Sequence, residues 1–143
     1  MRYVVADANV LARALIKTTG SDAKIAAAAV AGKIKLCFSL VSLQEVKRII
    51  NYPRIKKKYL ITPQQQEIFL NNLTTFGKLI VPRIKINICR DKMDNEILSV
   101  AATLAQNRQI WLVTGDKDIL VLKGKIPGVE ILTAGEFITI IRN

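Results

Sequence analysis

Short apolar runs alternate with amphipathic helical patterns along almost the whole chain, and this alternation restricts the possible folds more than any other feature. The expected strands are residues 3–6, 34–38, 110–113 and 129–132, with a weaker extended stretch at 79–88. The expected helices are residues 8–17, 22–31, 42–50, 63–76 and 94–106, with a last helix opening at Thr133. Apolar strands separated by helices favour a mostly parallel sheet that is covered on both faces. We therefore predict an α/β fold with one domain over residues 1–143.

Composition excludes several kinds of chemistry and of protein. Histidine is absent, so Ser-His and Cys-His catalysis and histidine metal ligands are excluded. The two cysteines, Cys37 and Cys89, have no metal-ligand spacing, and we expect buried apolar residues rather than a disulfide. No apolar run approaches the roughly 18 residues of a membrane span, and the start MRYVVAD lacks the apolar region of a signal peptide. We expect a soluble, cytoplasmic protein.

The charge is strongly unbalanced, with 22 basic against 11 acidic residues and a net charge of +11. Clustered lysine and arginine bind phosphates by releasing counterions, so the charge indicates nucleic acid or an acidic protein as a partner. The densest basic run surrounds Lys57, and a solvated helix face is its ordinary explanation. The alternative is a patch that binds RNA phosphates, formed by Arg48, Arg54, Lys56, Lys57 and Lys58.

Two acidic residues follow the first two expected strands. Asp7 directly follows the first strand, and Glu45 lies in the helix after the second. Each has an ordinary structural explanation, since Asp7 fits a helix N-cap and Ser42-Leu-Gln-Glu45 fits a capping box. Asn9 fits a turn equally well. Neither acid indicates function by itself.

Two later segments add further acids. Asp94 lies one turn before the buried stripe of its helix and on the same face, so its side chain points toward the sheet. Asp91 is an alternative N-cap, which would leave Asp94 in a first turn where the helix dipole favours negative charge. Asp116 and Asp118 directly follow the strand 110–113, where glycine and two aspartates also suit an ordinary turn.

The four segments become informative together, because a parallel sheet gathers the carboxyl ends of its strands at one edge. Two carboxylates about 4 Å apart repel by about 4 kcal/mol at an effective dielectric of 20, so such a cluster needs protons, lysines or a cation. Mg²⁺ or Mn²⁺ suits ligands that are all oxygen. Without histidine, a metal-bound water is the natural nucleophile. The sequence therefore predicts phosphodiester hydrolysis.

At these residues the chain resembles the PIN-domain family of small metal-dependent ribonucleases, and among them the VapC-like toxins of toxin-antitoxin pairs. The matching segments are Asp7-Ala-Asn9, Ser42-Leu-Gln-Glu45, Arg90-Asp-Lys-Met-Asp94-Asn and Thr114-Gly-Asp116-Lys-Asp118-Ile-Leu. They span nearly the whole chain in the expected order. The resemblance implies a three-layer α/β/α fold, an RNA substrate, a small antitoxin that covers the acidic pocket, and a homodimer.

The resemblance also implies roles for individual residues. Catalysis and metal binding would fall to Asp7, Glu45, Asp94 and Asp116, with Asp118 as a supporting metal ligand. Asn9 and Thr114 would orient ligands or substrate. Relatives of this kind often carry a second acid after the third motif aspartate, and this chain has Asn95 there. That difference concerns the second position and leaves the role of Asp94 intact.

Two other functions fit parts of the pattern. A receiver domain or a haloacid-dehalogenase-like phosphatase needs a second acid beside the first motif aspartate, and Asn9 stands at the phosphatase position. A module of the same fold that binds nucleic acid or a protein without cleaving is compatible with the charge. RNA binding without cleavage in manganese would identify such a module.

Overall fold

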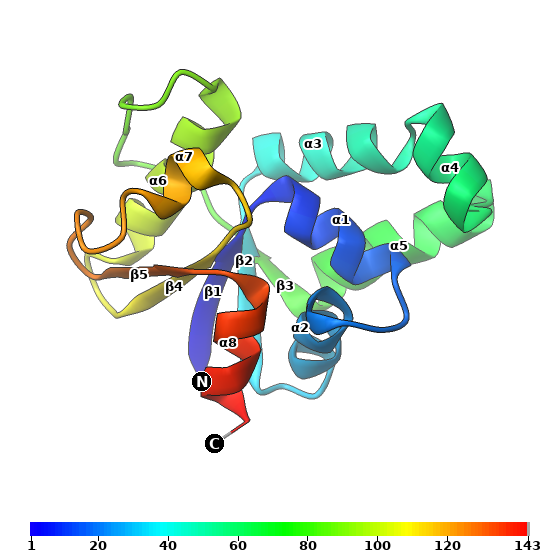
Figure 1. Ribbon diagram of the computed structural model, residues 1–143, viewed down its shortest axis with the longest axis horizontal. Helices are drawn as coiled ribbons and strands as arrows, with labels where there is room; N and C mark the ends of the chain where they lie inside the picture. The colour runs from blue at the N-terminus through cyan, green and yellow to red at the C-terminus, as the bar shows by residue number, and fades with distance from the viewer. Residues whose placement is uncertain (143) are drawn as a thin grey trace.

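The computed structural model describes residues 1–142, and over these residues five parallel strands form one sheet in the order β3-β2-β1-β4-β5 (Figure 1). The strands are β1 (Arg2–Ala6), β2 (Ile34–Phe38), β3 (Gly77–Leu79), β4 (Ile110–Val113) and β5 (Val129–Leu132). All four strand pairs are parallel. Every strand therefore ends at the same edge of the sheet.

Helices cover both faces of this sheet. The first face carries α1 (Ala8–Ile16), α2 (Ser21–Val30), α3 (Leu40–Ile50), α4 (Pro53–Tyr59), α5 (Pro63–Phe76) and α8 (Ala134–Ile141). The second face carries α6 (Lys92–Leu104) and α7 (Lys117–Leu120). The result is the predicted three-layer α/β/α fold with a central parallel sheet.

The apolar runs in the sequence are explained by these two covered faces. Val4 and Ala6 of β1 pack in the core beneath the first group of helices, and Val5 between them packs against α6. In β4, Leu112 and Val113 divide in the same way between the two cores. A strand that is buried on both faces has no reason to alternate with polar residues.

The start of α3 differs from the prediction. The helix begins at Leu40, and Ser39 is its N-cap, with a side chain that accepts a hydrogen bond from the Ser42 amide at 3.1 Å. The expected start at Ser42 is wrong, and no capping box joins Ser42 to Glu45. Both serines are chemically suitable caps, and the one that directly follows β2 takes the position. Glu45 is consequently an interior residue of α3 and is not needed for capping.

The extended stretch expected at 79–88 is also only partly right. The strand β3 is limited to Gly77–Leu79, and the chain from residue 80 to α6 has no regular structure. The backbone amides of this segment are instead bonded by α6 side chains at distances of 2.8 to 3.0 Å. Those side chains are spaced one helical turn apart and are Asn95, Ser99 and Thr103. We refer to residues 83–90 as the α6-bound segment.

The remaining predicted elements agree with the structure to within two or three residues at their ends. Thr62 and Thr133 cap α5 and α8 in capping boxes. Both cysteines are free; Cys37 is buried and Cys89 is half-buried. Among the described residues, no helix is both long enough and apolar enough to cross a membrane.

Candidate active site

A pocket of about 150 Å³ opens at the carboxyl edge of the sheet, between the starts of α1, α6 and α7 and the second half of α3. All four principal motif acids line it together with Asn9. The acidic residues around the pocket are Asp7, Glu45, Asp91, Asp94 and Asp116. The parallel topology thus brings together acids that are far apart in the sequence.

Asp7 has a structural role and a position in the pocket at the same time. It is the N-cap of α1, where its Oδ1 accepts a hydrogen bond from the Val10 amide at 2.8 Å. Its Oδ2 accepts a hydrogen bond from the hydroxyl of Thr114. Only 7% of Asp7 is exposed. The two hydrogen bonds fix the carboxylate before any ligand arrives.

Thr114 connects two of the acidic segments. It is fully buried at the end of β4, where its hydroxyl donates to Asp7 and its Oγ1 accepts from the Asp116 amide at 3.0 Å. One hydroxyl therefore sets the position of the first motif aspartate and of the turn that carries the fourth.

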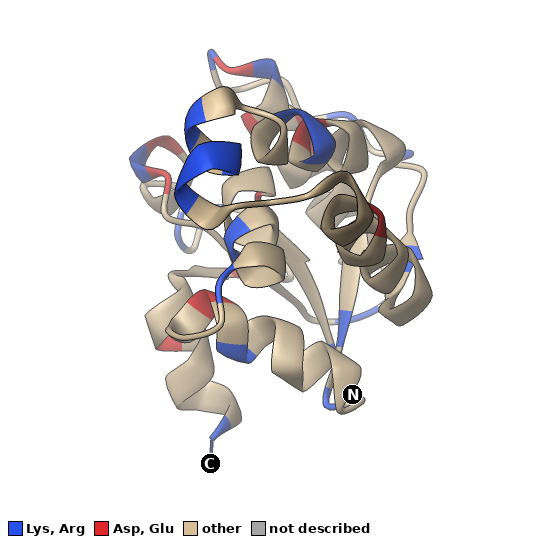
Figure 2. Cartoon of the chain, turned by 90° about the vertical axis from the view of Figure 1, so that its right-hand side faces the viewer, with Lys and Arg blue, Asp and Glu red and all other residues tan. Residues whose placement is uncertain are grey.

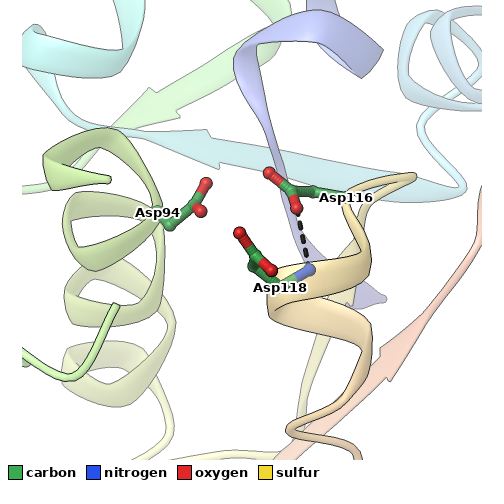
Figure 3. A group of neighbouring side chains, drawn as sticks. All are labelled: Asp94, Asp116 and Asp118. Carbon is green, nitrogen blue, oxygen red and sulfur yellow. Dashed lines mark hydrogen bonds between the residues drawn. The ribbon is translucent and has the colours of Figure 1, made fainter. Parts of the chain in front are cut away.

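Asp94, Asp116 and Asp118 form the tightest acidic group, with carboxylate oxygens that lie within 4.8 Å of one another. Figure 3 shows the three carboxyl groups facing a common point between α6 and the start of α7. Asp116 is the N-cap of α7 and accepts from the Asp118 amide at 2.8 Å. Capping again holds the carboxylate in place without removing it from the cluster.

Asp94 is the least satisfied member of this group. It is only 6% exposed, and its Oδ2 has no hydrogen-bond partner among residues 1–142. Burial, and after it the charges of Asp116 and Asp91, raises the pKa of Asp94 to about 7. A buried carboxylate with a free oxygen, facing two other carboxylates, is a donor set that suits a hard divalent cation.

Glu45 and Arg48 form an ion pair at the side of the pocket. The Glu45 carboxylate accepts from both Nε and Nη2 of Arg48, and Arg48 also contacts the hydroxyl of Tyr52. Arg48 was predicted to bind RNA, and the structure places it on the pocket wall rather than among the lysines of α4. Glu45 lies in the pocket but outside the tight group of three carboxylates.

Asp91 lines the pocket in addition to its expected role as a helix cap. It is the N-cap of α6 and accepts from the Met93 amide at 2.8 Å, and it also lines the pocket. Its place just before Asp94, at a helix start beside an acidic cluster, was the available signal.

Asn95 faces away from the acids. Its Oδ1 accepts from the amides of Ile88 and Cys89, and its Nδ2 donates to the Cys89 carbonyl at 2.8 Å. A carboxylate cannot make that last donation. The side chain therefore holds the α6-bound segment, and this role needs an amide rather than an acid at position 95.

The raised pKa of Asp94 predicts how a divalent cation changes the stability of the folded protein at different pH values. The ordinary pKa of 3.8 rises to about 7, so the folded protein holds this proton more tightly than the unfolded chain does. The resulting stabilisation is complete below about pH 4 and is lost as the pH rises through about 7. A cation offsets that loss, so manganese should raise the melting temperature more at about pH 8 than at about pH 5.5.

Thermal melting in manganese and in EDTA at both pH values measures this difference. Asp94→Asn is the control and should show a smaller difference between the two pH values. Equal manganese shifts at both pH values in the natural protein would contradict the expected link between this carboxylate and the cation.

Comparison with known proteins agrees with the geometry. The family model for the PIN domain matches residues 3–118, which include all the pocket acids. An uncharacterized protein of Methanocaldococcus jannaschii is 32% identical over 120 residues, which cover 84% of this chain and 74% of that protein.

Proposed function

The chain belongs to the PIN-domain family, and on that basis we propose that it is a metal-dependent endoribonuclease, the toxin of a toxin-antitoxin pair. PIN domains are generally nucleases that use divalent metals, and this much follows from membership. The observation that supports the proposal most strongly is the buried Asp94 carboxylate, with one oxygen unpartnered among residues 1–142, facing Asp116 and Asp118.

The cation proposed for this site is Mg²⁺ or Mn²⁺, because every available donor is oxygen and the group carries several negative charges. When bound, the cation supplies the positive charge that activates a water molecule and stabilises the phosphoryl oxygens. The proposed ligands are Asp7, Glu45, Asp94, Asp116 and Asp118.

The other pocket residues are proposed to prepare this site for RNA. Thr114 holds Asp7 in place, while Asn9 is exposed on the pocket wall and offers its amide to a substrate. Arg48 holds Glu45 and brings positive charge to the side of an acidic pocket. A positive charge there lowers the repulsion between the pocket acids and an approaching phosphate.

A basic helix lies beyond this arginine along the chain, and we include it in the proposed RNA surface. Figure 2 shows the blue residues of α4, which carries Arg54 and the lysines 56–58. None of these four forms an ion pair with a described residue. We predict that Lys56→Ala with Lys57→Ala weakens RNA binding. For single-stranded RNA, the slope of the logarithm of the binding constant against the logarithm of salt concentration should become shallower by about 1.4. Unchanged affinity at two salt concentrations would remove α4 from the RNA surface.

The biological partners of the proposal are a small antitoxin that covers the acidic pocket, and a second copy of the chain in a homodimer, in the cytoplasm. These parts rest on the resemblance of the motifs to those of VapC-like toxins. Cleavage of an RNA pool in manganese, with none in EDTA, tests the catalytic part. RNA binding without cleavage would favour a binding module of the same fold.

A further inference from the structure

A second polar pocket, of about 260 Å³, lies near the starts of β1 and β4 and the end of β3. It is formed around Tyr3 of β1, the end of α6 and the turn before β4. Three cations line it, namely Lys78, Arg83 and Arg108, together with the amide side chains of Gln106 and Asn107. No acidic residue lines it. We call it the cationic pocket.

Two of the three cations of this pocket, Arg108 and Lys78, lie over the aromatic ring of Tyr3. The Arg108 guanidinium lies 3.8 Å from the centroid of the Tyr3 ring, and the Lys78 ammonium lies 5.7 Å from it. Within the described part of the chain, neither forms an ion pair, and Arg83 forms none. The ring of Tyr3 therefore orients the charges of Arg108 and Lys78, and none of the three charges is neutralised by an ion pair among residues 1–142.

The local field is positive despite the helix end nearby. The carboxyl end of α6 contributes roughly half a negative charge, against three full positive charges. Burial raises the pKa of the Cys37 thiol beneath this region to about 11, and Lys78, Arg108 and Lys35 act in the opposite direction. The charge around this pocket is therefore predominantly positive.

The α6-bound segment connects this cationic pocket to the pocket lined by the motif acids, which we call the carboxylate pocket. It passes along α6 from Thr103 near the helix end to Asn95 near the helix start, a distance of roughly 12 Å at 1.5 Å per residue. Within it, Ile84 and Ile86 are half-buried, while Arg83 and Lys85 are exposed. The alternation places the two isoleucines against the protein and the cations in solvent.

From this arrangement we propose that an RNA strand held at the carboxylate pocket continues along the α6-bound segment, and that its backbone phosphates bind in the cationic pocket. The inference rests on RNA being the substrate of the proposed function. The phosphodiester backbone is the anion that suits the site, since the exposed cations Arg83 and Lys85 and the cationic pocket lie along one segment, as phosphates lie along a strand. The stacked Arg108 presents its free N–H groups to phosphate oxygens.

The test is fluorescence anisotropy of a labelled 20-nucleotide RNA in EDTA, where binding is measured without cleavage. Lys78→Gln with Arg108→Gln removes two phosphate contacts, so the salt slope should fall by about 1.4 and affinity at 0.1 M salt by roughly 25-fold. Arg83→Gln with Lys85→Gln should act in the same direction without touching the ring of Tyr3. Lys24→Gln with Lys125→Gln removes the same charge from exposed positions elsewhere and should change affinity much less.

Equal losses in the control and in both test variants would overturn the proposal, since the effect would then belong to net charge alone. Displacement of the RNA by uridine monophosphate at constant ionic strength would show a site for free phosphate groups and would overturn the backbone assignment. The proposed nuclease activity has a separate test, and RNA that stays intact in manganese would contradict that activity alone. In that case, a loss of RNA binding in the two test variants but not in the control would still support an RNA path through the cationic pocket.

Discussion

Replacing Asp94 by asparagine is expected to lower RNA cleavage by roughly two to three orders of magnitude, the range for losing one preorganised electrostatic contact in an active site. The same substitution should raise the melting temperature in EDTA at about pH 8. The reason is that burial and neighbouring acids raise the pKa of this carboxyl to about 7, so its charged form is costly in the folded protein. Asparagine removes the charge at nearly the same volume.

Lower cleavage together with a higher melting temperature distinguishes a lost catalytic contact from poor folding. A variant that merely folds poorly loses activity and stability together. Glu67→Gln is the matched control, because it removes one negative charge from an exposed position of α5 and should leave cleavage unchanged. Undiminished cleavage by Asp94→Asn would exclude this carboxylate from the chemistry, and a lower melting temperature would contradict the electrostatic explanation.

Thr114→Val is expected to have the second-largest effect on cleavage, through weaker binding of manganese. The substitution keeps the shape of a fully buried side chain and removes the hydroxyl that donates to Asp7 and accepts from the Asp116 amide. Losing a residue that orients ligands typically lowers metal affinity or activity by about 10- to 100-fold. The manganese concentration needed for half-maximal cleavage should therefore rise.

Thr114→Ser separates this effect from packing, since serine keeps the hydroxyl and loses only a methyl group. Serine should restore most of the manganese affinity, although the missing methyl costs some stability. Valine leaves an oxygen of Asp7 without its donor, which costs about 1 to 3 kcal/mol. Equal manganese dependence for the valine variant and the natural protein would show that the hydroxyl does not position the site.

The sheet and most helices were predictable because their signals are local. The strand β4 is a continuous apolar run and β2 is interrupted only by Lys35, while Thr62 and Thr133 mark helix starts by their own capping chemistry. The gathering of Asp7, Glu45, Asp94 and Asp116 at one pocket follows from the parallel order of the strands. The roles of these residues remain predictions.

The features that the sequence does not predict depend on contacts between distant residues or on a choice between equivalent residues. Ser39 and Ser42 are equally good caps, and the end of β2 decides between them. The α6-bound segment has the composition of a strand, and only the fold shows that polar side chains of α6 occupy its amides. The cationic pocket joins Tyr3, Lys78 and Arg108, which no local pattern connects.

The measurement that tests the central claim most directly is cleavage of a mixed fluorescent RNA pool by the purified protein. Three samples are compared: the natural protein in manganese, the natural protein in EDTA, and Asp7→Asn in manganese. The proposed ribonuclease cuts RNA only in the first sample, because cleavage needs both the cation and the intact carboxylate held by Thr114. Intact RNA in all three samples, with manganese still raising the melting temperature, would contradict cleavage of general RNA; equal cutting in all three would contradict a metal-dependent carboxylate site.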